Sequence, residues 1–231
     1  MIAARRALLL ATLAVGCTVT PSPPATGAAP TTAPTPATPA PSPSPSPTGI
    51  PAKEVAGPTG VLAPGRYTHR GFEPRITFEL DGPWHSVNAV RDFFDVQQDV
   101  GSPDVIAVQF GRPDLAAAGP EQATPITTAE GAVSTLTSNG RLVTVESSSV
   151  EIGGLTGFQV TVENPGDEAD LTPVVRVSLG VLQIAPGRRL RCSFFDTPNG
   201  VLAILVGGSV AKWDEALAAA QPVIESVTVG E

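Results

Sequence analysis

Several residue types that mark common functional sites are scarce in this sequence. Its 231 residues include two cysteines and two histidines. The histidines do not stand at metal-ligand spacing from each other or from a cysteine, and a structural zinc site takes four such ligands, so zinc is disfavoured. The sequence also lacks the Gly-x-Gly-x-x-Gly and Gly-x-x-x-x-Gly-Lys loops that hold nucleotide phosphates. We therefore expect no metal ion and no cofactor.

The N-terminal apolar run is too short for a permanent membrane span. Arg5 and Arg6 precede an apolar run over residues 7–16, and small residues stand before Cys17. About ten residues of helix cover about 15 Å, which is half of a hydrocarbon core of roughly 30 Å. A basic start, a short apolar stretch and small residues before a cut site are typical of an export signal. Residues 1–16 are therefore predicted to be a signal peptide.

The residues around Cys17 resemble a known processing motif. Ala14, Val15, Gly16 and Cys17 are similar to the lipobox of bacterial lipoproteins. The resemblance implies that the signal is cut before Cys17 and that Cys17 carries the lipid, which makes the membrane a partner of the mature protein. Each buried methylene contributes about 0.8 kcal/mol, and stable attachment takes more than one acyl chain. The alternative is an ordinary signal cut near Gly16 or at a later small-residue site, with a freely secreted product and an incidental Cys17.

The segment after Cys17 has the composition of a linker. Residues 18–52 hold no charged residue and almost no large apolar side chain, and proline recurs among threonine, serine and alanine. Because so little apolar surface offsets the entropy lost on ordering, residues 17–57 are predicted to be a disordered linker that proline keeps extended. At roughly 3.1 Å per residue, residues 18–52 of this linker could reach about 110 Å. It either lifts a domain from the membrane as an O-glycosylated stalk or serves as a plain tether.

Residues 58–231 have the composition of a single folded domain. Roughly 175 residues can bury a substantial core without disulfides or a metal ion. This segment holds 11 lysines and arginines against 21 aspartates and glutamates, a formal charge of −10. An acidic surface repels phosphate backbones and anionic lipid headgroups. Nucleic acid is therefore not expected as a partner.

Periodicity and turn residues predict strands over most of this domain. Alternating apolar residues, or short apolar runs bounded by glycine and proline, are typical of strands. The predicted strands lie at residues 75–80, 93–96, 105–110, 142–152, 158–162, 174–179, 190–195 and 201–206, with a short edge strand within 224–229. The run at 201–206 is apolar throughout, which favours a central strand covered on both faces. A loop rich in proline and glycine is expected from residue 111 to about Ile126.

Two helices are predicted among these strands. The first is capped by Thr127, has Glu130 at capping-box spacing and stops near Gly140. The second covers residues 211–220, where apolar residues recur at i, i+3, i+4 and i+7, and Pro222 should kink or end it. The expected fold class is α+β, an antiparallel sheet of about six to eight strands flanked by two helices, preceded by the disordered Pro/Thr/Ser-rich linker.

Several segments resemble a group of secreted bacterial proteins. They are Leu-Ala-Pro-Gly-Arg-Tyr-Thr at residues 62–68, Phe-Glu-Pro-Arg-Ile-Thr-Phe at 72–78, Gly-Pro-Trp at 82–84 and Ile-Gly-Gly-Leu-Thr-Gly-Phe-Gln-Val-Thr-Val at 152–162. These segments are similar to uncharacterised secreted proteins of actinobacteria and related bacteria. The element order further resembles the PsbP-like fold, also found in mycobacterial Lpq-type lipoproteins. The resemblance implies an antiparallel sheet flanked by helices and an accessory or binding role without a catalytic site.

Four residues could support nucleophilic chemistry. Cys192 lies on the apolar face of a predicted strand, so we expect a small buried hydrophobe, because a reactive thiol needs exposure and a neighbouring base. His69 and His85 lie near aromatic residues in predicted loops or strand edges, and Ser86 follows His85. Adjacency in sequence is not the geometry of a catalytic triad, and no Gly-x-Ser-x-Gly elbow is present.

Two groups of carboxylates raise the alternative of calcium, which takes several oxygen ligands from one loop. The first group is Asp92, Asp95, Asp99 and Asp104, and the second is Asp167, Glu168 and Asp170. Neither has EF-hand spacing, so a solvated acidic loop is the plainer interpretation of each.

Three arginines close together in sequence raise a different pair of alternatives. Arg188, Arg189 and Arg191 could bind an anionic group on a partner, since the arginine fork matches carboxylate and phosphate. They could instead guard an exposed hairpin edge against unwanted strand pairing, which we consider the plainer interpretation.

The sequence as a whole predicts a lipid-anchored, extracytoplasmic protein on the outer face of the membrane. Its domain, displayed on a stalk, is expected to bind an envelope protein or a small ligand and to catalyse nothing. No catalytic, cofactor-binding or metal-binding residue is predicted, and Cys17 is the expected lipidation site. A small cell-envelope hydrolase with His69 or His85 as a base and a structural spacer protein remain open as alternatives, as does a secreted location.

Overall fold

The computed structural model describes residues 51–55, 60–69, 71–117, 123–166 and 171–230. These residues belong to one compact unit, Pro47–Glu231. The predicted signal peptide, Cys17 and most of the predicted linker lie outside the described residues. The first described strand, β1 (Lys53–Glu54), begins before residue 58, where the composition placed the start of the domain. No helix in the described part of the chain is both long and apolar enough to cross a membrane.

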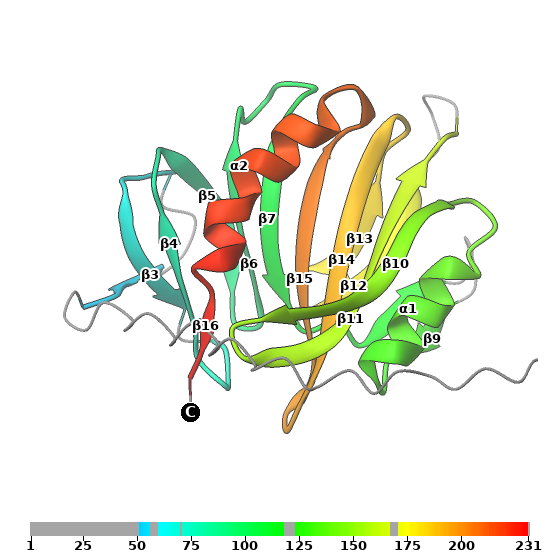
Figure 1. Cartoon of the computed structure of the whole chain (residues 1–231), viewed down its shortest axis with the longest axis horizontal. Helices are drawn as coiled ribbons and strands as arrows, with labels where there is room; N and C mark the ends of the chain where they lie inside the picture. The colour runs from blue at the N-terminus through cyan, green and yellow to red at the C-terminus, as the bar shows by residue number, and fades with distance from the viewer. Residues whose placement is uncertain (1–50, 56–59, 70, 118–122, 167–170, 231) are drawn as a thin grey trace, which may run out of the picture. The chain divides into compact units, whose positions relative to one another are not determined.

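Within the described residues, eight antiparallel strands form a central sheet (Figure 1). In spatial order they are β10 (Val143–Ile152), β11 (Leu155–Asn164), β14 (Arg188–Thr197), β15 (Gly200–Ser209), β7 (Ile106–Gly111), β6 (Phe93–Gln98), β5 (Trp84–Val90) and β2 (Gly60–Leu62). Tight hairpins join β10 to β11 and β14 to β15, because glycines with positive φ at Gly153, Gly154 and Gly200 allow the turns. The predicted antiparallel sheet of six to eight strands is confirmed.

Two smaller sheets, each of four strands in the described chain, were not predicted. One has the order β1, β3 (Gly65–His69), β4 (Ile76–Leu80) and β16 (Thr228–Val229). The other has the order β13 (Gly180–Ile184), β12 (Thr172–Val177), β8 (Leu115–Ala117) and β9 (Ala123–Pro125). The loop expected up to Ile126 therefore contains β8 and β9. Proline is tolerated there because β9 is an edge strand, where Pro125 need not donate to a ladder.

Helix α1 (Ala129–Thr137) begins one residue later than predicted. Thr128 rather than Thr127 is the N-cap, with extended backbone and with its side-chain oxygen accepting a hydrogen bond from the Gly131 N–H at 3.1 Å. The predicted capping box does not form, because Glu130 is then only two residues from the cap. A carboxylate from β14 helps to fix this start, since Asp196 accepts a hydrogen bond from the Ala129 N–H at 2.8 Å.

Helix α2 (Trp213–Glu225) follows the short 3₁₀ helix η1 (Val210–Lys212) and extends past Pro222. Pro222 was expected to kink or end the helix, and the second alternative was wrong, since the helix continues to Glu225. The proline lies in the last turn, where it removes one backbone hydrogen bond, and the apolar stripe continues beyond it to Val223, which is fully buried. The helix then stops after Glu225, where the Ser226 N–H bonds back to the Pro222 carbonyl at 3.1 Å.

The central sheet separates two hydrophobic cores, and β15 contributes to both. Leu202, Ile204 and Val206 belong to the first core, while residues 201, 203 and 205 belong to the second. This alternation is what a strand buried on both faces requires, so the interpretation of the apolar run at 201–206 is confirmed.

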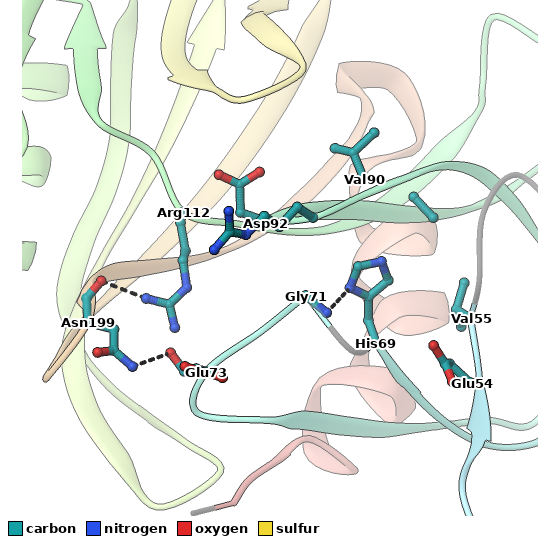
Figure 2. A pocket seen from close by; sticks show the side chains of 11 residues that line it. Glu54, Val55, His69, Gly71, Glu73, Val90, Asp92, Arg112 and Asn199 are labelled. Carbon is teal, nitrogen blue, oxygen red and sulfur yellow. Dashed lines mark hydrogen bonds between the residues drawn. The ribbon is translucent and has the colours of Figure 1, made fainter.

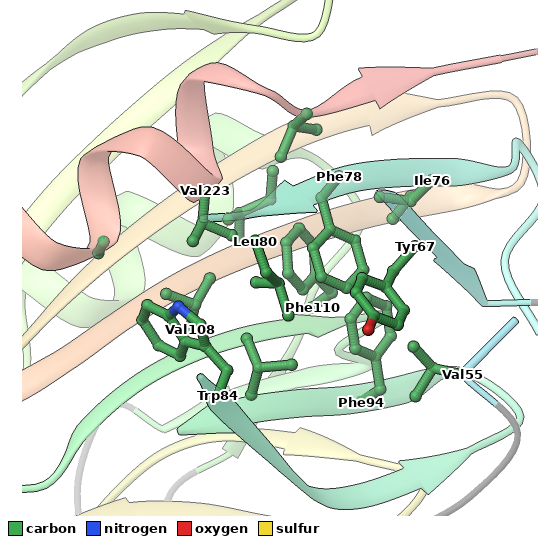
Figure 3. Packing of buried hydrophobic residues seen from close by; sticks show 14 of the residues in the cluster. Val55, Tyr67, Ile76, Phe78, Leu80, Trp84, Phe94, Val108, Phe110 and Val223 are labelled. Atoms are coloured by element: carbon green, nitrogen blue, oxygen red, sulfur yellow. The ribbon is translucent and has the colours of Figure 1, made fainter. Parts of the chain in front are cut away.

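The first core is covered by α2 and by the sheet of β3 and β4 (Figures 1 and 3). Aromatic rings dominate it: the ring centroids of Phe94 and Phe110 are 4.6 Å apart, and those of Phe78 and Phe94 are 5.4 Å apart. The second core is covered by α1 and the sheet of β12, and its side chains are mostly aliphatic. The central sheet is thus flanked by both helices, one on each face.

Candidate functional site

A cleft of about 800 Å³ opens beside the first core, and we call it the His69 cleft (Figure 2). Its walls come from β1, from the end of β3 and the loop that follows, from the turn between β5 and β6, and from the turn between β14 and β15. The lining residues are Glu54, Val55, His69, Gly71, Glu73, Ala89, Val90, Arg91, Asp92, Arg112 and Asn199. The cleft therefore depends on segments that lie far apart in sequence.

His69 forms the inner wall of this cleft and is 7% exposed. Its ring stacks on Phe94, with centroids 5.2 Å apart, and meets Phe72 edge-on at 5.7 Å. The Gly71 N–H donates a hydrogen bond to Nδ1 at 3.0 Å, so the neutral ring carries its proton on Nε2. Burial lowers the pKa of His69 from its ordinary value, and the charge of Glu54 opposes this shift only in part. At neutral pH His69 is therefore an uncharged ring with no free lone pair.

The loop after His69 fits against the neighbouring turn because residue 71 is glycine. A Cβ atom on Gly71 would lie 1.5 Å from the Arg91 carbonyl oxygen, a distance that no side chain can occupy. The close approach brings the backbone of Gly71 within reach of His69 Nδ1. The cleft wall and the hydrogen bond to the imidazole thus depend on the same residue.

Arg112 places a guanidinium in the cleft (Figure 2). Its Nη1 donates to the Asn199 carbonyl at 2.6 Å, and the side-chain amide of Asn199 donates to the Glu73 carbonyl at 3.0 Å. Burial lowers the pKa of Arg112 from its ordinary value, and the charges of Asp92 and Glu73 oppose that shift. A guanidinium stays protonated in proteins and has five N–H donors. Within the described chain, its hydrogen bond to Asn199 leaves other donors for a bound molecule.

The charges around the cleft have both signs. Arg91 and Arg112 are cationic, whereas Glu54, Glu73 and Asp92 are anionic. Asp92 also accepts a hydrogen bond from the Ser178 hydroxyl. The arrangement suits a small polar molecule that presents an anionic group to Arg112 and hydroxyl or cationic groups to the carboxylates.

The other proposed catalytic residues are not brought to this cleft. His85 and Ser86 are consecutive residues of β5, so their side chains point to opposite faces of the sheet. Ser86 is buried, with 3% of its surface exposed. The pair therefore does not form the nucleophile and base of a hydrolase.

The first carboxylate group is dispersed among separate partners. Asp95, which is 1% exposed, accepts hydrogen bonds from the Asn88 backbone N–H at 2.7 Å and from the Gln97 side chain at 2.8 Å. Asp104 instead accepts from Ser209 at 2.9 Å and pairs with the Lys212 ammonium at 3.1 Å. Among the residues that the structure describes, no group of three or more histidine, cysteine, aspartate or glutamate side chains could hold a metal ion. The second group, at 167–170, lies outside the described residues.

The three arginines do not guard a sheet edge, so that interpretation was wrong. They lie on β14, which is paired on both sides, by β11 and by β15. Arg188 donates to the carbonyls of Pro103 and Val105 at 2.7 and 2.5 Å. Arg189 pairs with Glu163 at 2.8 Å, and Arg191 pairs with Glu146. Sequence spacing could not show this, because the position of β14 in the sheet depends on long-range strand pairing.

Cys192 is buried in the second core, as predicted. It is fully buried on β14 in the same core as Leu190 and Phe194. Burial strongly raises the pKa of its thiol. The side chain is therefore a packed apolar group in the folded protein.

Sequence reasoning identified part of the His69 cleft. His69 was singled out as a candidate base, and Asp92 was placed in a possible calcium group. Arg112 and Asn199 were missed because neither belongs to a sequence motif. Arg112 directly follows the end of β7, and Asn199 lies in the turn between β14 and β15.

No protein-family model matches the sequence, and no curated protein matches it. Solved structures show weak likenesses. The solution structure of CyanoP, the cyanobacterial PsbP of Synechocystis sp. PCC 6803, has a TM-score of 0.40 at 13% identity, covering 75% of this chain and 96% of that one. LpqN of Mycobacterium tuberculosis, described as involved in cell envelope biogenesis, has a TM-score of 0.38 at 11% identity, covering 73% of this chain and 92% of that one. The Ran-binding protein Mog1p of Saccharomyces cerevisiae has a TM-score of 0.36 at 8% identity, covering 73% and 96%.

These structures include a PsbP-type and an Lpq-type protein, the two kinds named by the sequence resemblance. With TM-scores below 0.5, these likenesses carry no argument about the His69 cleft or the function of this chain.

Proposed function

We propose that the protein is a non-catalytic binding protein of the cell envelope. Its Cys17 carries the lipid that holds it to the outer face of the membrane, and its Pro-rich linker carries the folded domain outward. The domain binds a small polar ligand, or a polar group of an envelope protein, in the His69 cleft. Nucleic acid is not a partner, because the domain is strongly acidic.

The state of His69 is the observation that carries the non-catalytic part of this proposal. A general base must accept a proton from the reacting group. In His69 one ring nitrogen already accepts the Gly71 N–H, and the other carries the ring proton. Among the described residues, those that line the cleft include no serine, threonine, cysteine or lysine that could serve as a nucleophile.

Arg112 and its surroundings support ligand binding. The guanidinium is held in place through Asn199, which is itself held by the Glu73 carbonyl. A donor group fixed in this way loses little conformational freedom when a ligand binds. Arginine also matches the planar geometry of a carboxylate or phosphate oxygen pair.

Crosslinking in intact cells tests whether the His69 cleft meets a partner. A photoreactive amino acid is introduced at Val90, which is 36% exposed on the rim of the cleft, and at Val100, which is 50% exposed beyond the opposite end of β6. We expect a specific adduct from position 90 but not from position 100. The adduct should fall at least tenfold when Arg112→Gln removes the guanidinium. No adduct from position 90, or an equal adduct from both positions, would instead favour a spacer protein.

Fractionation and mass spectrometry test the anchor. The mature N-terminus should be a lipid-modified Cys17. The Cys17→Ser variant cannot carry the lipid, so it should either leave the membrane fraction for the culture medium or keep its signal peptide uncut. An unmodified chain that begins after Cys17 would support the secreted alternative.

The hydrolase alternative predicts that His69→Ala or His85→Ala abolishes an activity found in a substrate screen, whereas the binding proposal predicts no such loss.

A further inference from the structure

A second groove, of about 380 Å³, lies between α2 and the end of β10, and we call it the β10–α2 groove. It is separate from the His69 cleft and shares no lining residue with it. Residues of β11, β14 and β15 form its floor, and those of α2 form one wall. The lining residues are Val150, Glu151, Ile152, Gly153, Gln159, Arg191, Ser193, Ile204, Val206, Leu217, Ala220, Gln221, Ile224 and Glu225.

The other wall of the groove is the end of the edge strand β10. Residues 150, 151, 152 and 153 line it consecutively. Because successive side chains of a strand point to opposite faces, a groove lined by consecutive residues follows the edge of the strand. β10 pairs with β11 on one side, and within the described chain no further strand pairs with its other side (Figure 1).

The hairpin geometry shows which backbone groups are available on this edge. Ile152 and Leu155 flank the two-residue turn, so they form a hydrogen-bonded pair that closes the hairpin. Hydrogen-bonded and non-hydrogen-bonded pairs alternate along an antiparallel ladder. Val150 therefore bonds to β11 like Ile152, whereas Ser149 and Glu151 direct their N–H and C=O groups away from β11.

This edge is only partly protected against strand addition. Proteins blunt exposed edges with short strands, proline, charged side chains or β-bulges. β10 has ten residues and contains neither proline nor lysine, and its irregularity between Thr144 and Glu146 lies outside the segment that lines the groove. The other edge of the same sheet, β2, has three residues, and the edge strand β9 has three residues and ends in Pro125. Within the described sheets β10 is thus the longest edge strand and an open one.

The side chains of the groove indicate the chemistry of its occupant. Leu217, Ile204 and Ile224 offer apolar contacts, and Glu151 and Glu225 are exposed carboxylates at the rim. Arg191, the one cation among the described residues that line the groove, is already paired with Glu146. The two rim carboxylates therefore favour an occupant that carries positive charge.

We propose that the β10–α2 groove binds an extended peptide segment of a partner protein, which pairs with β10 as an added strand. The segment alternates apolar side chains, which contact Leu217 and Ile224, with lysine or arginine, which approaches Glu151 and Glu225. Its backbone bonds to the outward groups of Ser149 and Glu151. Strand addition of this kind takes affinity from main-chain hydrogen bonds and specificity from alternate side chains.

Fluorescence anisotropy with the full chain and a labelled peptide tests the proposal. The probe is a capped seven-residue peptide in which valine alternates with lysine and threonine. It should bind with a dissociation constant below about 1 mM. The same peptide with N-methyl groups on every second amide cannot complete the ladder and should bind at least tenfold more weakly. Equal binding of the two peptides, or no binding of either, would overturn the proposal.

Charge-reversal variants locate the binding on the protein. Glu151→Lys and Glu225→Lys change exposed residues, so both variants should fold, and each should weaken binding at least threefold. Glu130→Lys is the matched control, since it changes the same charge at an exposed position of α1 on the other face of the sheet. Equal weakening by Glu130→Lys would show attraction by net charge alone and would contradict the proposed site. Ser149→Pro, with folding checked by circular dichroism, should remove binding by blocking an outward N–H.

Discussion

The two faces of the central sheet are built from different kinds of side chain. The first core stacks Phe78, Phe94 and Phe110 beneath α2 and the β3–β4 sheet. The second core packs mostly alanine, valine and leucine against α1 and includes Cys192. The aromatic stack extends outward to His69, whose ring lies on Phe94, so the first face supports the His69 cleft. The comparison teaches that stacked aromatic rings can extend a core as far as the wall of a cleft and pack against an imidazole there. The aliphatic core on the other face has no such stack of rings.

The largest expected effect is the loss of a ring from the aromatic core. Phe94 is fully buried and contacts three other rings of the core and that of His69. Phe94→Ala should lower the free energy of unfolding by about 3–5 kcal/mol, because the cavity cannot be refilled by neighbouring rings. Urea denaturation measures this, with Phe158→Ala as the matched control, since Phe158 is 39% exposed and should cost less than about 1 kcal/mol.

A smaller loss is expected from the aliphatic core. Leu205 is fully buried on the second face, and Leu205→Ala should lower the free energy of unfolding by about 2–4 kcal/mol. Leu171→Ala serves as the control, because Leu171 is 52% exposed. The contrast between the two faces would disappear if Leu205→Ala cost more than Phe94→Ala in the same urea experiment.

Cys192 gives a further test of the apolar character of the second core. Cys192→Ser places a hydroxyl in an apolar core without a partner and should cost about 1–3 kcal/mol. Cys192→Ala leaves a small cavity and should cost less. Because burial raises the pKa of the thiol, Cys192 of the folded Cys17→Ser variant should react with a thiol reagent only as fast as the protein unfolds. This variant removes the other cysteine of the chain, so rapid labelling under native conditions would place Cys192 at the surface instead.

The smallest expected effect is a pH dependence at the edge of the first core. The unfolded chain protonates His69 as the pH falls below about 6.5, whereas the folded chain does so only at lower pH because burial lowers the pKa. Between the two pKa values the unfolded state binds more protons than the folded state. The contribution of His69 to stability is therefore constant above about pH 6.5 and falls as the pH drops from there to the folded pKa. Thermal unfolding from pH 4 to pH 8 should show that fall. His69→Gln should reduce it; an unchanged profile in His69→Gln would contradict the burial argument.

The sequence predicted the elements whose patterns are local. Two features can each be recognised from a few consecutive residues: the uninterrupted apolar run that forms β15, and the helix stop near Gly140. Errors came where a distant segment decides the outcome. Asp196 of β14 helps to set the start of α1, and β8 pairs with β12 to build a sheet outside the central one. Pro222 did not end α2, because the helix was still packed against the first core.

The amino-acid sequence by itself determined the alternation of apolar residues, the turn positions, the burial of Cys192 and the acidic charge of the domain. It also predicts an export signal before Cys17 and a lipidation site at that residue. The tertiary structure alone decided that β14 is an inner strand, that β10 is an open edge, and that His69, Arg112 and Asn199 share one cleft. The physical reason is that strand order and cleft geometry depend on pairings between residues far apart in the chain, whose free energy is absent from any short window of sequence.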